Sequence, residues 1–172
     1  GIRPMVVRGS SMQPTLEPGQ LAWLDKAYYR GRPIQRDDVV VFRWQGRSYV
    51  KRVYALSGEH VTLMCADETS WPISAACAAR VQRLADRYHY LSLRTVEVPA
   101  GSFFCIGDNT NCSVDSRQLG PIPITAIIGR PSRVIRAPKS DTVWAAHRRR
   151  KSRWRRSGLR REDWEVMGLL AV

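Results

Sequence analysis

The chain of 172 residues is long enough for one domain with a substantial core, and two full-sized domains would be crowded in it. Its hydrophobic content of 44% and charged content of 25% exclude a disordered or collagen-like polymer. The formal net charge is +13, and nine of the 28 basic residues fall between Arg148 and Arg161, a stretch without acidic residues. Such a cluster of positive charge attracts phosphate, either of nucleic acid or of anionic lipid.

The predicted elements are mostly strands. Between residues 4 and 128, short apolar runs alternate with turn residues, which is typical of a mainly β domain. We predict strands over residues 5–8, 21–25, 38–44, 47–54, 60–64, 91–98, 103–106 and 124–134. Residues 65–90 interrupt this rhythm, and their Ala-rich part, 74–85, predicts either a short helix or an irregular excursion from the sheet.

The organisation that follows is a domain over residues 1–137 and a basic C-terminal extension over residues 138–172, with a basic helix predicted at 141–161. No stretch reaches the roughly 18 apolar residues that span a bilayer. Because the chain begins with Gly1 and not with Met, we expect that an upstream segment has been removed and that any membrane anchor lies outside this chain.

The four cysteines do not have the spacing of zinc ligands, and we expect neither a metal nor another cofactor. Their even number suits disulfides in an oxidising compartment, but four cysteines allow three pairings, and all four are equally compatible with buried thiols. Cys65 and Cys77 flank the excursion, which favours a bond between them. Cys105 and Cys112 are expected to stay apart from any catalysis.

A first candidate for chemistry is the segment from Gly9 to Leu16, which follows an apolar strand and contains a proline turn. A serine at this point projects from a strand end. Gly9 lets a backbone approach closely and leaves N–H groups free to face an oxyanion. Taken alone, the segment fits an ordinary Ser-rich turn equally well.

A second candidate is Lys51, in the strongly strand-forming run from Tyr49 to Tyr54. Alternation places Lys51 on the same face as Tyr49 and Val53, and burial there would lower its pKa from the ordinary value of about 10.4. A neutral lysine can accept a proton from a serine hydroxyl. Lysines on strands are more commonly solvated, and none of the three histidines lies in a context that suggests catalysis.

A third candidate is the polar stretch from Gly107 to Arg117, directly after an apolar run. Its turn formers and short hydroxyls suit either an ordered site or a simple polar hairpin loop.

In order and in internal spacing, the three segments resemble the type I signal peptidase family. The family motif Ser-Met-x-Pro-Thr-Leu is matched by residues 11–16, and Lys-Arg-Val with a following Gly-acid pair is matched by residues 51–53 and 58–59. Gly-Asp-Asn-x-x-x-Ser-x-Asp-Ser-Arg is matched by residues 107–117. The departures are Ser57 in place of a usual proline, and Thr110 and Cys112 in place of the commoner Arg and Asn.

The resemblance implies a signal-peptidase-like catalytic domain of coiled antiparallel sheets and a serine endopeptidase that removes leader peptides with a Ser/Lys dyad. By this resemblance Ser11 is the nucleophile and Lys51 the general base. Ser113 would hydrogen-bond and orient the lysine, and the side chains expected to hold the loop by ion pairing are Asp108, Asp115 and Arg117.

The resemblance also implies how a substrate would bind. The oxyanion hole would use the backbone N–H of Ser11 and a second donor near Gly9, where some family members carry a serine hydroxyl. The leader peptide would add as a strand between the segment before the nucleophile and the strand of the lysine, next to Met5, Val7 and Val50.

The expected partners are signal-peptide-bearing preproteins and membrane lipid, without nucleic acid, and the expected place is the extracytoplasmic side of the cell membrane. The sharper interpretation of the C-terminal extension is membrane contact, and the plainer one is a solvated basic tail. Two other functions compete with the peptidase. One is a self-cleaving repressor-type Ser/Lys protease, and the other is a catalytically idle relative whose tail docks on membrane or nucleic acid.

Overall fold

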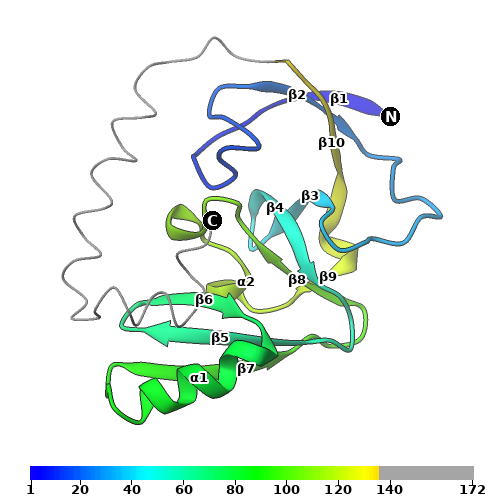
Figure 1. Ribbon diagram of the computed structural model, residues 1–172. Coiled ribbons are helices and arrows are strands. Elements are labelled where there is room, and N and C mark those ends of the chain that lie inside the picture. Colours follow the sequence, from blue (N-terminus) through cyan, green and yellow to red (C-terminus); the bar gives the residue numbers. More distant parts are fainter. Residues whose placement is uncertain (136–172) are drawn as a thin grey trace.

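The computed structural model describes residues 1–135, which form a mainly β structure as predicted (Figure 1). A seven-stranded antiparallel sheet has the order β1-β2-β10-β3-β4-β8-β9, and a three-stranded sheet has the order β6-β5-β7. The larger sheet contains β1 (Ile2–Val6), β2 (Leu21–Asp25), β3 (Val39–Trp44), β4 (Arg47–Ala55), β8 (Ser102–Ile106), β9 (Ile122–Pro123) and β10 (Ile127–Ile135). The smaller sheet contains β5 (His60–Ala66), β6 (Thr69–Ile73) and β7 (Leu91–Glu97), and the two α-helices are α1 (Ala75–Ala85) and α2 (Ser116–Leu119).

Six of the eight predicted strands match observed strands to within two residues at each end, namely β2, β3, β4, β5, β7 and β8. The first and last predictions are misplaced. β1 begins at Ile2 and ends at Val6, before the turn at Gly9. Residues Ile124–Ala126 form a 3-10 turn and not a strand, because the Ile127 N–H bonds back to the Ile124 carbonyl before β10 begins.

Of the two alternatives for residues 74–85, the short helix is confirmed as α1, and the irregular excursion over residues 65–90 is wrong. The whole segment is regular. It completes β5 and supplies β6 and α1 (Figure 1). Ser74 caps α1 by accepting a hydrogen bond from the Cys77 N–H. A separate core holds these elements together, and its buried members are Met64, Ile73, Val81 and Leu91.

The predicted disulfide between Cys65 and Cys77 is also absent, because the four cysteines form no disulfide with one another. Successive side chains of a strand point to opposite faces, so Cys65 and its neighbour Met64 diverge. Met64 packs in the cluster beneath α1, as Cys77 does, whereas Cys65 packs against the cluster on the other face of the small sheet. The two thiols therefore lie on different sides of β5.

The centre of the larger sheet is built from β3, β4 and β8, which carry two buried clusters. One contains Val40, Phe42, Val53 and Phe103, and the second joins Phe104 and Ile106 to Val61 and Leu63 of the small sheet. β4 pairs with β3 from Arg47 to Arg52 and with β8 from Arg52 to Ala55, so Lys51 lies directly before the part of the strand that pairs with β8.

The boundary predicted at residue 137, the extension 138–172 and the basic helix at 141–161 lie outside the described residues. Within residues 1–135, no helix has the length and apolar character needed to cross a membrane.

Candidate active site

The segment between β1 and β2, residues 7–20, is called here the nucleophile loop. Three of its side chains, Val7, Met12 and Leu16, form a buried cluster that packs against Val39 of β3 and Val50 of β4. Met12 is 2% exposed, so the residue after Ser11 is anchored in the interior. This apolar anchor brings the loop against the strand that carries Lys51.

Lys51 and Ser11 are in direct contact, although forty positions separate them in the sequence. The Lys51 Nζ donates a hydrogen bond to Ser11 Oγ at 2.7 Å and a second one to the Val50 carbonyl at 2.9 Å. The lysine is 4% exposed, and its ammonium group lies 5.8 Å from the centre of the Tyr49 ring. Of the two alternatives for Lys51, buried or solvated, the structure shows the buried one, on the Tyr49 side of the strand.

Burial lowers the pKa of Lys51, because the charged ammonium loses its hydration. The carboxylates of Asp115 and Asp108 act in the opposite direction but do not cancel the effect of burial. No side-chain carboxylate forms an ion pair with Lys51 among residues 1–135. The site thus holds a lysine that loses its proton more readily than an ordinary lysine, next to a serine hydroxyl.

The polar stretch from Gly107 to Arg117, called here the clamp loop, holds the backbone around Ser11. Asn109 donates from its backbone N–H to the Ser11 carbonyl and from its side-chain Nδ2 to the Ser10 carbonyl, each at 2.9 Å. A Cβ on Gly107 would overlap Ser113 Oγ and lie 2.6 Å from the Ser11 carbonyl oxygen. Only glycine fits there.

Asp108 forms an ion pair with Arg52 of β4, a partner outside its own loop. Its carboxylate accepts hydrogen bonds from Arg52 Nε at 2.8 Å and Arg52 Nη2 at 2.7 Å, and one from the Thr15 hydroxyl. These bonds lower the pKa of Asp108, although burial opposes them. One carboxylate therefore links the clamp loop to β4 and to the nucleophile loop.

Asp115 and Arg117 form a buried ion pair inside the clamp loop, as expected. Their closest distance is 2.8 Å, and the two side chains are 0% and 4% exposed. Asp115 also accepts the Gly107 N–H at 2.9 Å and caps α2, while Arg117 donates to the carbonyls of Thr110 and Ser113. This pair sets the path of the loop beneath the dyad.

Ser113 is buried beside Gly107, but it does not make the hydrogen bond to Lys51 that the resemblance implied. Its Oγ finds no hydrogen-bond partner among residues 1–135. Lys51 instead uses the Val50 carbonyl as its second partner.

The residues expected to bind substrate differ in exposure. Met5 and Val50 are half-buried, whereas Val7 is 4% exposed and belongs to the anchoring cluster. Val7 therefore presents almost no surface to a peptide in this structure. Gly9 is exposed and has a φ of 75°, a backbone conformation that favours glycine.

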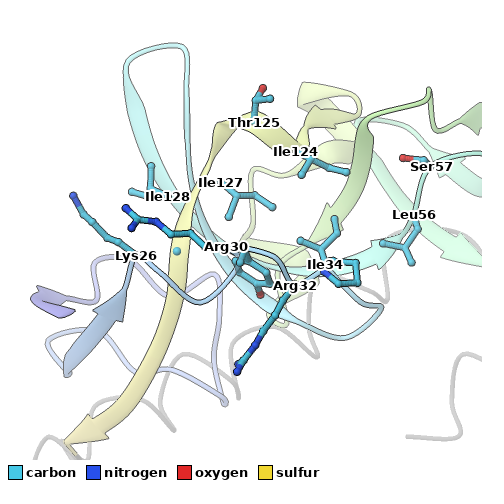
Figure 2. A pocket seen from close by; sticks show the side chains of 13 residues that line it. Lys26, Arg30, Arg32, Ile34, Leu56, Ser57, Ile124, Thr125, Ile127 and Ile128 are labelled. Atoms are coloured by element: carbon cyan, nitrogen blue, oxygen red, sulfur yellow. The ribbon is translucent and has the colours of Figure 1, made fainter. Parts of the chain in front are cut away.

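A pocket of about 440 Å³ lies elsewhere, between the segment after β2 and the start of β10 (Figure 2). Its walls combine basic side chains, Lys26, Arg30 and Arg32, with isoleucines of residues 124–128. It contains none of the predicted site residues, and Ser11 and Lys51 lie outside it. Residues 1–135 also contain no group of three His, Cys, Asp or Glu side chains arranged to hold a metal ion.

The family profile described as signal peptidase, peptidase S26, matches residues 2–135, which includes every residue of the site. The chain belongs to this family. It is 33% identical over 135 residues to a signal peptidase I from Bacillus caldolyticus, covering 73% of this chain and 74% of that enzyme. The family is one of serine endopeptidases, and this membership removes the self-cleaving repressor as an alternative.

Two further comparisons give the range of similarity. Thylakoidal processing peptidase 1 of Arabidopsis thaliana is 28% identical over 156 residues, and the match spans 82% of this chain and 44% of the plant enzyme. A crystal structure of a signal peptidase I from Enterococcus faecalis V583 matches 58% of this chain and 97% of that chain at 25% identity, with a TM-score of 0.38.

Sequence reasoning assigned no separate role to four residues that the structure brings to the site, namely Thr15, Arg52, Gly107 and Asn109. All four stand inside the three matched motifs. Their position in the motifs was the available signal, but which atoms they bond is visible only when the loops are placed together.

Gly107→Ala tests the close approach of the clamp loop to Ser11. The added methyl group forces either Ser113 or the Ser11 carbonyl to move, and we expect the kcat for precursor cleavage to fall by about a hundredfold, as displacements of about 1 Å at an active site do. Because overpacking costs about 1–3 kcal/mol, thermal unfolding should be measured on the same variant. Unchanged kcat would show that the contact is not needed.

Proposed function

We propose that the chain removes N-terminal signal peptides from exported preproteins, with Ser11 as the nucleophile and Lys51 as the general base. The observation that carries this proposal is the 2.7 Å contact between Lys51 Nζ and Ser11 Oγ, at a lysine whose pKa is lowered by burial. The signal peptidase family, to which the chain belongs, supplies the reaction and the class of substrate.

The reaction follows from the two side chains. Ser11 Oγ attacks the carbonyl carbon of the scissile bond while its proton passes to the neutral Nζ of Lys51. The carbonyl oxygen becomes an oxyanion that accepts a hydrogen bond from the Ser11 N–H. The C–N bond then breaks as the leaving amine takes the proton from Lys51. A water molecule, deprotonated by the same lysine, hydrolyses the acyl ester and restores Ser11.

The remaining polar residues hold Lys51 and Ser11 in position relative to each other. We assign Asp108, Asp115 and Arg117 to support of the clamp loop, on the basis of their hydrogen bonds and ion pairs. Ser113 is assigned to support by its buried position beside Gly107 and not by a bond to Lys51.

The ladder pattern is compatible with a substrate that adds as a strand. Among the described strands β1 pairs only with β2, and β8 pairs with β4 only from Arg52 to Ala55, so residues 47–51 have no partner on that side. An extended peptide between these two edges would use their free backbone groups. Met5 and Val50 would flank it, and the N–H groups near Gly9 and Ser11 would face its scissile carbonyl.

Replacing the nucleophile or the base tests the dyad directly. We expect Ser11→Ala and Lys51→Ala each to slow cleavage of a signal-peptide-bearing precursor by at least about a thousandfold. Lys51→Arg should be equally inactive, because a guanidinium is never neutral at working pH. Lys26→Ala and Ser132→Ala, which change the same residue types outside the site, serve as controls. A catalytically idle relative would show no cleavage in the parent chain, and near-parental cleavage by Ser11→Ala would refute the mechanism.

The lowered pKa of Lys51 makes a prediction about pH. Below that pKa the amine is protonated and has no lone pair for the serine proton, so the enzyme is inactive. Above it the amine is neutral and the enzyme is active. We expect kcat/KM to rise with pH through one ionisation at a pH below the ordinary lysine value of about 10.4. A profile that falls over this range, or one without any ionisation there, would contradict Lys51 as the base.

We further propose that the chain works at the extracytoplasmic face of the cell membrane, where it would meet lipid and exported precursors and no nucleic acid. The support is compositional: nine basic residues lie between Arg148 and Arg161, and Trp144, Trp154 and Trp164 accompany them. Each basic residue near an anionic surface contributes about 1 kcal/mol to binding.

Vesicle co-sedimentation tests the lipid partner. The full chain should bind vesicles that contain anionic lipid more strongly than neutral vesicles, and added salt should weaken that binding. A chain ending at residue 139 is the comparison. If both chains bind equally, or if neither prefers anionic lipid, the extension is not a membrane contact.

A further inference from the structure

We propose that Asn109 is a positioning residue for the oxyanion hole: it fixes the two peptide units that flank Ser11 and thereby aims the Ser11 N–H at the developing oxyanion. The inference rests on the proposed function, because it takes Ser11 as the nucleophile and its backbone N–H as the oxyanion donor.

The primary observation is that one residue holds both carbonyls next to the nucleophile. Asn109 Nδ2 donates to the Ser10 carbonyl at 2.9 Å, and the Asn109 backbone N–H donates to the Ser11 carbonyl at 2.9 Å. The Ser10 carbonyl also accepts the Gln13 N–H at 3.2 Å. The peptide units before and after the Ser11 Cα are therefore both fixed by the clamp loop.

Because of peptide geometry, a hydrogen bond that fixes the Ser10 carbonyl also fixes the direction of the Ser11 N–H. The Ser10 carbonyl and the Ser11 N–H belong to the same planar trans peptide unit and point in opposite directions. A donor fixed on the carbonyl therefore sets the direction of the N–H on the other side. The same bond polarises the peptide unit, which strengthens the N–H as a donor.

The aim of this single N–H matters more here than in family members with a second donor. Gly9 stands where a serine hydroxyl would supply that donor, and glycine has no side chain to replace it. Oxyanion donors act when they lie about 2.7–3.1 Å from the oxyanion, and a tilted peptide moves the N–H out of that range.

The chemistry of the side chain explains why an amide is required. The Ser10 carbonyl is an acceptor, so its partner must donate, and the Asn109 NH₂ group does so. A carboxylate of the same shape has no proton to give and would repel the carbonyl oxygen. Asn109→Asp therefore removes the hold with almost no change in volume, and Asn109→Ala removes it without adding charge.

We expect both variants to lower kcat for precursor cleavage by about 10–100-fold, less than the roughly 10²–10³-fold cost of removing an oxyanion donor outright. KM should stay within about twofold. The matched control is Asn111→Asp, in the same loop, because the Asn111 side chain serves as an acceptor for Trp71 Nε1 and an aspartate preserves that acceptor. This control should cleave at close to the parental rate.

Two binding measurements separate oxyanion positioning from a general structural role. A peptide aldehyde with the leader sequence forms a tetrahedral adduct with Ser11, and its affinity should fall in parallel with kcat/KM in Asn109→Asp. The affinity for intact precursor, measured in Ser11→Ala, should not change when Asn109→Asp is added. The pH midpoint of kcat/KM should also stay in place in Asn109→Ala, because this variant adds no charge near Lys51.

The possible outcomes distinguish failure of this inference from failure of the proposed function. The inference is overturned if Asn109→Asp and Asn109→Ala keep kcat within about twofold of the parent chain. It is also overturned if precursor affinity or the unfolding temperature falls enough to account for the lost activity. Failure of the proposed function looks different, because Ser11→Ala or Lys51→Ala would then retain cleavage whatever the behaviour of Asn109.

Discussion

The proposed reaction requires a lysine without a charge, and the side chains around Lys51 are arranged in a way that suits this requirement. Lys51 is 4% exposed, and burial lowers its pKa. A carboxylate bound to its ammonium would reverse the effect, yet Asp108 and Asp115 both lie close enough to act on it. The structure engages these carboxylates elsewhere: Asp108 bonds Arg52, and Asp115 bonds Arg117 and the Gly107 N–H. The ion pairs near Lys51 therefore have a role besides stability. They occupy the carboxylates of Asp108 and Asp115, which then form no ion pair with Lys51.

Three segments far apart in the sequence build the site, and each is fixed by a different force. Apolar packing of Met12 and its neighbours seats the nucleophile loop on β3 and β4. Strand pairing on both sides fixes β4. Hydrogen bonds from Asn109 attach the clamp loop to the backbone around Ser11. Cys105 also lies near Lys51, but burial raises its pKa to about 12, so it remains a thiol and does not compete as a nucleophile.

Sequence patterns predicted much of this arrangement because they depend on local physics. Alternating apolar residues bounded by Gly and Pro gave the central strands, and the motifs around Ser11, Lys51 and Asp115 gave the residues that converge. Patterns failed where a contact depends on how distant elements pack. The direction of Cys65 away from α1, the partner of Asp108 across the site, and the lack of a hydrogen bond at Ser113 are of this kind. β6 was missed because Trp71 and Pro72 stand in place of the usual alternation, and its pairing with β5 decides its structure.

The small sheet and α1 share a core of their own. Hydrogen bonds from β6 and β7 connect this part of the molecule to the clamp loop. Arg117 donates to the Ser70 carbonyl, Trp71 donates to Asn111, and Arg94 donates to the Arg117 carbonyl. These contacts come from β6 and β7, while α1 faces away from the clamp loop in Figure 1. The small sheet with α1 therefore contacts the clamp loop through its strands and not through its helix. We therefore expect insertions at the end of α1 to leave the Ser/Lys pair in place, and a shift of β6 to move Arg117 and with it the base of the clamp loop. Variation in length within this family would be tolerated at the helix and selected against at the strand beside it.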